Sequence, residues 1–390
     1  MFDTKPVFKS NKQKQSAFPT FSKLNERDHE QVIFCYQPDA GLKAIIAIHN
    51  TTLGPALGGV RMWPYESEEA ALKDVLRLSR GMTYKAAISG LNLGGGKAVI
   101  IGDPHIDKTE ALFRAFGRYV DSLGGRYITA EDVGIDVQDM EWVFSETKYV
   151  TGIPKELGGS GDPSPVTAFG VYMGMKACSK KAYGTDSLAG KRIAIQGAGH
   201  VASHLAEYIS KENAKIFITD IYRKKAEEVA AKTGAEVVDP DDIYSLDVEI
   251  FSPCALGGVI NDDTINHFKC DIIAGGANNV LENEDRHGKM LLDAGILYAP
   301  DYVINAGGLI NVSGELEGYN QERAQQKAAR IYDTILDILN YSIENQTPSL
   351  TASNILAEER LRKIARIDSI YTSSSKFSKR KGEVYLRNRS

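Results

Sequence analysis

The chain contains a glycine pattern that follows one apolar segment and opens an amphipathic one. Arg192–Gln196 (RIAIQ) runs directly into Gly197-x-Gly199-x-x-Ala202, and the next apolar segment ends at Asp220. Small residues at the three positions allow a tight turn, close approach of a pyrophosphate to a helix N-terminus, and close packing of helix on sheet. An acid about 20 residues after the first glycine is placed to bind ribose hydroxyls. The sequence therefore predicts a β-α-β unit that binds a dinucleotide.

The acid at the end of the second strand also favours one cofactor. A carboxylate at Asp220 repels the 2′-phosphate of NADP, so we expect NAD. Arg223 and Lys224 follow closely and leave tolerance of NADP open. The other loop residues expected to line the cofactor site are Ala198, His200 and Val201.

Apolar periodicity on either side of this unit predicts an α/β protein with two domains and a cleft between them. At 390 residues the chain is more than twice a typical domain of ~150 residues. In its first part, strands over 43–49, 97–101 and 127–130 alternate with helices from Ser67 to Gly81 and over 109–123.

A stretch rich in glycine and proline at 151–165 predicts a hinge between the domains. After it we expect a helix over 166–182, and, beyond the glycine pattern, further strands over 248–251, 272–274 and 302–305. Each of these strands is followed by loop residues, as in a parallel sheet whose carboxyl edge forms a ligand site.

The composition excludes several classes of protein. A net charge of −5 argues against nucleic acid or an anionic membrane as partner. The four cysteines form no Cys-x-x-Cys pair, so we expect no disulfide framework and no metal site, and a reducing cytoplasm fits best. No stretch approaches the ~18 apolar residues of a membrane span. Residues 1–25 are expected to form an arm, and the basic segment after Tyr371 a solvated tail or a subunit contact.

Two lysines of the first part are unusual. Lys85 is expected just beyond the helix that begins at Ser67, and Lys97 follows the three glycines 94–96. A phosphate loop is excluded, because the chain has leucine and alanine where that motif requires glycine and serine or threonine. Glycines before a lysine allow a ligand to approach the backbone, so Lys97 is expected to line a cavity. Asp132, just after a strand, is a candidate catalytic carboxylate or a turn or helix cap.

Six longer segments occur in one order along the chain: TTLGPALGGVRMWPY, SRGMTYKAAISGLNLGGGKAVIIGDP, GRYITAEDVG, SGDPSPVTAFGVYMGMKA, FSPCALGGVIND and APDYVINAGG. Together they resemble the amino-acid dehydrogenases of the leucine, phenylalanine and valine dehydrogenase group. The resemblance covers about 31–367. It implies reversible, NAD-dependent oxidative deamination of an L-amino acid to a 2-oxo acid and ammonia by a homo-oligomer.

The resemblance also implies a division of the chain. A substrate-binding and oligomerisation domain would comprise 26–150 plus about 346–390, and an NAD-binding Rossmann domain would comprise 151–345. Matched position by position, Lys97 would be the general base and Asp132 its proton-relaying partner. Lys85 would bind the substrate carboxylate.

The remaining implied contacts belong to the cofactor and to the substrate side chain. Asn278 would bridge substrate and nicotinamide, and Thr167 would bind the carboxamide. Cys254 and Ala255 would lie beside the cofactor. The side-chain pocket would be formed by Leu57, Gly58, Ala130, Leu309 and Val312.

The substrate side chain and the function class each have alternatives. AEDVG and GLNLGGGK resemble the leucine-preferring branch, which implies leucine, valine or isoleucine as substrate. Leu309 is shared with relatives that prefer aromatic substrates, so phenylalanine or another aromatic amino acid is the alternative. Departures from the family pattern at Ile135-Asp136, Val280 and Ser313-Gly314 also bear on this choice. A non-catalytic NAD-binding sensor, and an aldehyde oxidiser using Cys254, are disfavoured because both lysines and Asp132 are present.

Overall fold

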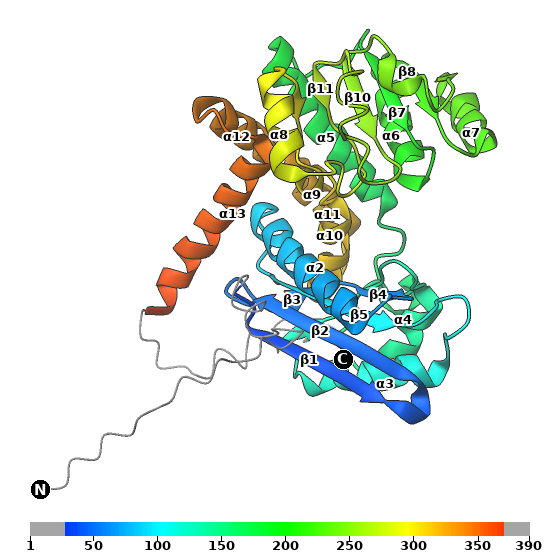
Figure 1. Cartoon of the computed structure of the whole chain (residues 1–390), viewed down its shortest axis with the longest axis vertical. Helices are drawn as coiled ribbons and strands as arrows, with labels where there is room; N and C mark the ends of the chain where they lie inside the picture. The colour runs from blue at the N-terminus through cyan, green and yellow to red at the C-terminus, as the bar shows by residue number, and fades with distance from the viewer. Residues whose placement is uncertain (1–27, 370–390) are drawn as a thin grey trace, which may run out of the picture.

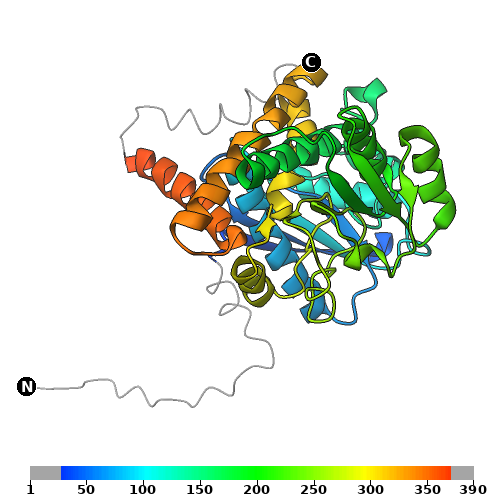
Figure 2. The same ribbon diagram turned by 90° about the horizontal axis from the view of Figure 1, so that it is seen from above.

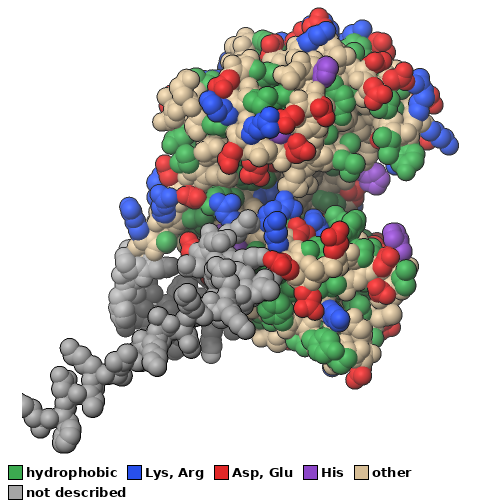
Figure 3. All heavy atoms as spheres, viewed as in Figure 1, with side chains coloured by type: hydrophobic (Ala, Val, Ile, Leu, Met, Phe, Trp, Pro, Cys, Tyr) green, Lys and Arg blue, Asp and Glu red, His purple; other side chains and the backbone are tan. Residues whose placement is uncertain are grey.

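The computed structural model describes residues 28–369 and confirms the predicted two-domain α/β fold. Two lobes meet at a narrower waist (Figures 1 and 3), and each lobe is built on one six-stranded sheet. The expected arm over 1–25 and the basic tail lie outside the described residues. The proposed boundaries at 151 and 346 stay predictions.

The sheet of the first lobe is mixed. β1 and β2 are antiparallel, as are β2 and β5, whereas the other pairs are parallel. The strand order is β1 (Gln31–Gln37), β2 (Leu42–Asn50), β5 (Gly94–Ile101), β3 (Ala56–Leu57) and β6 (Tyr127–Ile128), with β4 (Val60–Trp63) also paired to β5.

Helices cover both faces of this sheet. α2 (Glu68–Ile88) buries Leu72 and Val75 against one face. α3 (Glu110–Ser122) and α4 (Val137–Phe144) bury their apolar sides against the other. The first lobe is therefore a three-layer α/β/α unit, with the sheet between the helices.

The prediction that the helix from Ser67 ends at Gly81 is wrong. Ser67 is the N-cap, and its hydroxyl accepts from the Ala70 backbone N–H at 3.1 Å, but α2 continues to Ile88. A glycine inside a helix costs about 1 kcal/mol, and burial of Tyr84 and later residues in the last turns opposes that cost. Lys85 consequently lies within the last turn of α2.

The sheet of the second lobe is entirely parallel. Its order is β12 (Leu297–Tyr298), β11 (Ile272–Ile273), β10 (Ile250–Pro253), β7 (Arg192–Gln196), β8 (Lys215–Thr219) and β9 (Glu236–Val237). Numbered within the lobe from β7, this is the order of a Rossmann fold, in which the strand order reverses between the first and fourth strands while all strands stay parallel. The crevice expected at that switch point lies between β7 and β10.

Side chains of the second sheet alternate between two helical layers. Ile193 and Ile195 pack with α5 (Ser164–Tyr183) and α6 (His200–Ser210). Ala194, between them, packs with the cluster that includes α8 (Glu284–Asp293). α7 (Arg223–Thr233) joins β8 to β9.

The predicted strand over 302–305 is wrong, because this segment is the short helix α9 (Asp301–Ile304) and the strand is β12. A short apolar run cannot be assigned by periodicity alone. The Pro300 carbonyl accepts the Ile304 N–H at 3.0 Å, and the Asp301 carboxylate accepts the Tyr302 N–H at 2.6 Å, so the first turn of the helix is stabilised locally.

The chain then forms α10 (Gly307–Ser313), the 3-10 turn η4 (Gly314–Glu317), α11 (Gln321–Ala329), α12 (Ile331–Glu344) and α13 (Ser349–Ala365). α13 extends to one side in both ribbon views (Figures 1 and 2) and packs on α2. Its Arg360 donates to the carbonyls of Ala87 and Leu91 at 2.7 and 2.9 Å, which caps the end of α2. None of the described helices is long and apolar enough to cross a membrane.

Candidate active site

Lys97 and Asp132 are adjacent in the structure. Lys97, on β5, is 7% exposed, and its Nζ lies 2.9 Å from Asp132 Oδ2 in the loop after β6. Arg61 of β4 binds the same oxygen through Nε at 3.1 Å and reaches Asp74 at 3.0 Å. Burial raises the pKa of Asp132, but Lys97 and Arg61 outweigh burial and hold it below its usual value. Asp132 is therefore ionised at neutral pH and shared by two cations.

The glycines before Lys97 serve a purpose different from the one expected. A Cβ on Gly95 would lie 2.1 Å from the Thr83 nitrogen of α2, and one on Gly96 would lie 2.7 Å from the Tyr127 ring. The space beside this backbone is thus taken by protein, because α2 and β6 approach β5 closely. The glycines set the position of Lys97 through packing.

Lys85 of the first lobe is hydrogen-bonded to Asn305 of the second lobe, which in turn binds Asn278. Its Nζ donates to Asn305 Oδ1 at 2.7 Å, and Asn305 Nδ2 donates to Asn278 Oδ1, also at 2.7 Å. Burial lowers the pKa of Lys85 to about 8; the nearby Asp301 opposes this shift, and Lys97 adds to it. The first lobe thus contributes a cation, and the second contributes amide groups and a buried acid.

Sequence reasoning missed Asn305, Asp301 and Arg61 as members of this site. Asp301 and Asn305 lie four residues apart around α9, so a helix brings both toward Lys85. In a strand the same two residues would lie about 13 Å apart, too far for both to face Lys85. Arg61 stands in the quoted segment GGVRMWPY, but no pattern within one strand indicates its contact with Asp132.

The cofactor loop has the predicted geometry. Gly197 has φ of +102°, where a side chain is strained, and a Cβ there would lie 3.0 Å from that of Ala255. Gly199 is the N-cap of α6, and a Cβ there would meet open space. The loops after β7 and β10 therefore meet at the switch point, where a dinucleotide fits with its pyrophosphate on the α6 N-terminus.

Asp220 lies beside this loop. Its carboxylate accepts from the Ala198 backbone N–H and the Tyr222 backbone N–H, both at 2.8 Å. Each carboxylate oxygen has a second lone pair that can accept a ribose hydroxyl. His200 is exposed, with Nδ1 3.6 Å from Asp162, and Val201 is partly buried.

Two candidate cofactor contacts have protein partners in the structure. The Thr167 hydroxyl donates to the Pro163 carbonyl at 2.9 Å, so its carboxamide contact stays a prediction. Cys254 Sγ accepts from the Gly276 N–H at 3.4 Å, and burial raises the pKa of this thiol. A protonated thiol is a poor nucleophile, which disfavours the aldehyde-oxidising alternative.

The expected side-chain pocket draws on both lobes. Leu57 and Leu309 are buried in one hydrophobic cluster, and Val312 packs at its edge. Gly58 and Ala130 lie on neighbouring strands or strand extensions, where the Gly58 N–H donates to Ile128 and the Ala130 carbonyl accepts from Val60. These contacts place apolar surface at the junction.

One departure from the family pattern, Asp136, caps a helix. Asp136 is the N-cap of α4, accepting from the Gln138 and Asp139 N–H groups at 3.0 and 3.2 Å, and it also binds Lys108. This carboxylate therefore stabilises the N-terminus of α4. Val280 is buried, and its N–H donates to Asp301.

Among residues 28–369, no cluster of three His, Cys, Asp or Glu side chains could hold a metal ion.

Two family models match almost the whole described chain. One is described as the Glu/Leu/Phe/Val dehydrogenase dimerisation domain and matches 29–149. The other, glutamate/leucine/phenylalanine/valine dehydrogenase, matches 158–222 and 218–367. The chain belongs to this family. It is an amino-acid dehydrogenase, a class of enzyme that uses a nicotinamide cofactor.

Individual relatives of this dehydrogenase differ in the substrate they are named for. Leucine dehydrogenase of Bacillus subtilis (strain 168) is 58% identical over 346 residues, which cover 89% of this chain and 95% of that protein. Phenylalanine dehydrogenase of Caldalkalibacillus thermarum is 51% identical over 358 residues, covering 90% and 96%. The crystal structure of L-tryptophan dehydrogenase from Nostoc punctiforme has a TM-score of 0.80 at 49% identity, covering 88% of this chain and 99% of that one.

Proposed function

We propose that this dehydrogenase catalyses the NAD-dependent, reversible oxidative deamination of leucine, valine or isoleucine to the 2-oxo acid and ammonia. The observation that carries the proposal is the buried Lys97–Asp132 pair at 2.9 Å, close to a second lysine that is bound to the opposite lobe. Lys85 can bind the substrate carboxylate, while Lys97 can accept and release protons. The relatives named leucine dehydrogenase support a branched aliphatic side chain.

Each residue has a distinct part in the reaction. The Lys85 ammonium binds the substrate carboxylate, with Asn305 fixing its direction. When held by the Gly197–Ala202 loop and Asp220, NAD would supply the acceptor for the hydride of the α-carbon, and the substrate, once its ammonium group has lost a proton to solvent, would be left as an iminium. Once Lys97 has released its own proton, it takes a proton from the water that attacks this carbon and passes it to the amino group, which leaves as ammonia. Asp132 stabilises the Lys97 ammonium formed in this step.

The assignment of NAD rests on the carboxylate of Asp220 and on the ion pairs made by Arg223. From its place at the end of β8, the carboxylate would face a 2′-phosphate of NADP, and like charges repel. Arg223, which could offset this repulsion, is bound to Glu227 at 3.1 Å and to Asp239 at 3.2 Å. Lys224 and Lys225 are then the neighbouring cations that would favour NADP.

An aromatic substrate is the second candidate. It is supported by the relatives named phenylalanine and L-tryptophan dehydrogenase, at 51% and 50% identity. The deciding experiment supplies NAD and a panel of L-amino acids and follows NADH absorbance. Higher kcat/KM for leucine, valine or isoleucine than for phenylalanine and tryptophan supports the proposal; the reverse order supports the second candidate, and no turnover with any of them refutes both.

We also propose that the chain works as a homo-oligomer in the cytoplasm. The segment 29–149 matches a dimerisation domain. The edge strand β1 exposes Phe34 and Tyr36 by 60% and 62%, and an edge strand with exposed aromatic side chains can pair with a second copy. Light scattering on the purified full chain tests this: a monomeric mass would refute it.

A further inference from the structure

A cavity of about 190 Å³ lies between the turn that follows α2 and the segment from α10 to the start of α12. Lys97 and the glycine loop are not among its walls. One wall is the turn Ser89–Leu93, and the other is formed by Ser313, Leu316, Glu317, Arg323, Lys327 and Arg330. The cavity therefore touches both lobes at a place that the proposed reaction does not use.

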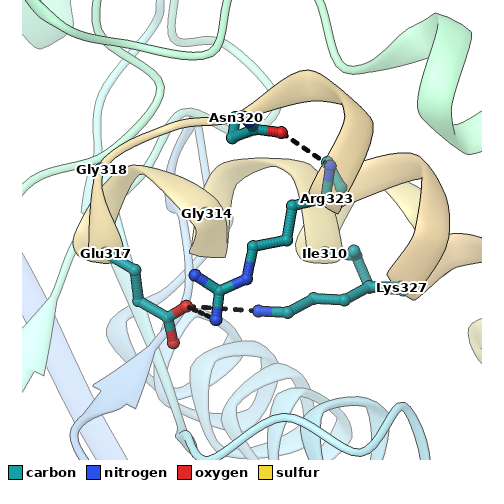
Figure 4. Close-up of a pocket in the computed structure, with 8 residues that line it drawn as sticks. Ile310, Gly314, Glu317, Gly318, Asn320, Arg323 and Lys327 are labelled. Atoms are coloured by element: carbon teal, nitrogen blue, oxygen red, sulfur yellow. Dashed lines mark hydrogen bonds and ion pairs between the residues drawn. The ribbon is translucent and has the colours of Figure 1, made fainter.

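The charges in its wall are unbalanced. Arg323 Nη2 and Lys327 Nζ share one oxygen of Glu317, at 2.9 and 3.4 Å; Figure 4 shows these ion pairs in a view of a neighbouring pocket that shares the three residues. Arg330 is exposed and has no ion-pair partner within the described residues. Three cations therefore face a single carboxylate.

The opposite wall is uncharged. It consists of the turn Ser89–Leu93, none of whose side chains is ionisable. A ligand that carries negative charge would therefore be held by the three cations of the other wall, while this turn closes the cavity from the first lobe.

The size of the cavity limits the ligand. Pockets for drug-sized molecules and cofactors have volumes of about 300–1,000 Å³, and one water occupies about 30 Å³. A volume of about 190 Å³ is thus too small for a nucleotide but sufficient for a compact anion. We propose that this cavity is a binding site for a small multivalent oxyanion, either inorganic phosphate or a short dicarboxylate.

The position of the site suggests what such an anion does. Ser89 lies four residues after Lys85, just past the end of α2, and Ser313 ends α10, which carries Leu309. An anion held in this cavity lies between the end of the helix that carries Lys85 and the helix that carries Leu309. We therefore expect the bound anion to lower the KM of the amino acid, an effect that goes beyond the proposed reaction itself.

The test is isothermal titration of the full-length protein with phosphate and, separately, with succinate. Saturating NAD keeps either anion from the α6 N-terminus, and sodium chloride maintains a constant ionic strength. Wild type is expected to bind at least one of the two anions saturably, and Arg330→Gln to bind it about tenfold more weakly. Arg126→Gln is the matched control, because Arg126 is also exposed and lies outside the cavity wall.

The outcomes are separable. Binding of phosphate alone, succinate alone or both identifies the chemistry of the ligand. The absence of saturable binding, or equal weakening in Arg126→Gln and Arg330→Gln, overturns the site. Binding without a change in KM overturns its coupling to the substrate. Turnover of amino acids in anion-free buffer is measured separately, so failure of the proposed reaction does not obscure the binding result.

Discussion

The depressed pKa of Lys85 predicts that substrate binding weakens as pH rises. Burial lowers the pKa of this lysine to about 8, so raising the pH removes its charge. Between pH 7 and pH 9 the charged fraction falls from about nine-tenths to about one-tenth. If only the ammonium form binds the carboxylate, the apparent dissociation constant of a 2-oxo acid rises about tenfold over this range. The ligand's own carboxyl group stays ionised throughout, because its ordinary pKa is about 3.5.

The assay measures the binding of 4-methyl-2-oxopentanoate to the enzyme loaded with NADH, without ammonia, through NADH fluorescence. The matched variant is Lys85→Gln, which removes the titrating charge and should bind about ten- to a hundredfold more weakly at pH 7, from a lost charged hydrogen bond of about 1.5–3 kcal/mol. Its affinity should not vary from pH 7 to pH 9. A wild-type dissociation constant that stays constant over this range, or a variant with the same pH dependence as wild type, would refute the assignment of Lys85.

Three other variants test the remaining parts of the site. Asp132→Asn leaves Lys97 without its counter-charge and should lower kcat by about 10²- to 10⁴-fold without weakening NADH binding; an unchanged kcat would remove Asp132 from catalysis. Asp220→Ser removes the like-charge repulsion, about 1–4 kcal/mol at contact distance near a surface, and should narrow the preference for NAD over NADP in kcat/KM; an unchanged ratio contradicts this role. Leu309→Ala should raise kcat/KM for phenylalanine relative to leucine and lower the free energy of unfolding by about 2–5 kcal/mol; a destabilised variant with unchanged selectivity would place Leu309 in the core alone.

The Rossmann sheet could be predicted because its signals are local. The glycine pattern, the strand before it and Asp220 lie within one β-α-β unit, and the structure shows the loop and the acid in contact. The strand over 43–49 and the helix over 109–123 also follow from periodicity within short segments. Tertiary packing overrode the local signal at Gly81, where α2 continues.

The candidate site was only partly accessible from sequence. Lys85, Lys97 and Asp132 stand in distinctive segments, but their partners come from elsewhere in the chain. Arg61 reaches Asp132 across neighbouring strands, and Asn305 reaches Lys85 from the other lobe. Contacts of this kind depend on how elements pack. A strand assigned to 302–305 would hold Asp301 and Asn305 about 13 Å apart, whereas one turn of helix brings them together.

The central claim is that Lys97 is the general base of an amino-acid dehydrogenase whose cofactor binds on the other lobe. Its most direct test is the Lys97→Ala variant, with leucine-dependent NADH formation and NADH affinity measured on the same preparation. We predict that deamination is abolished while the dissociation constant of NADH changes less than about twofold, because Lys97 lies on β5 and the dinucleotide loop follows β7. Retention of wild-type turnover by Lys97→Ala would contradict the account.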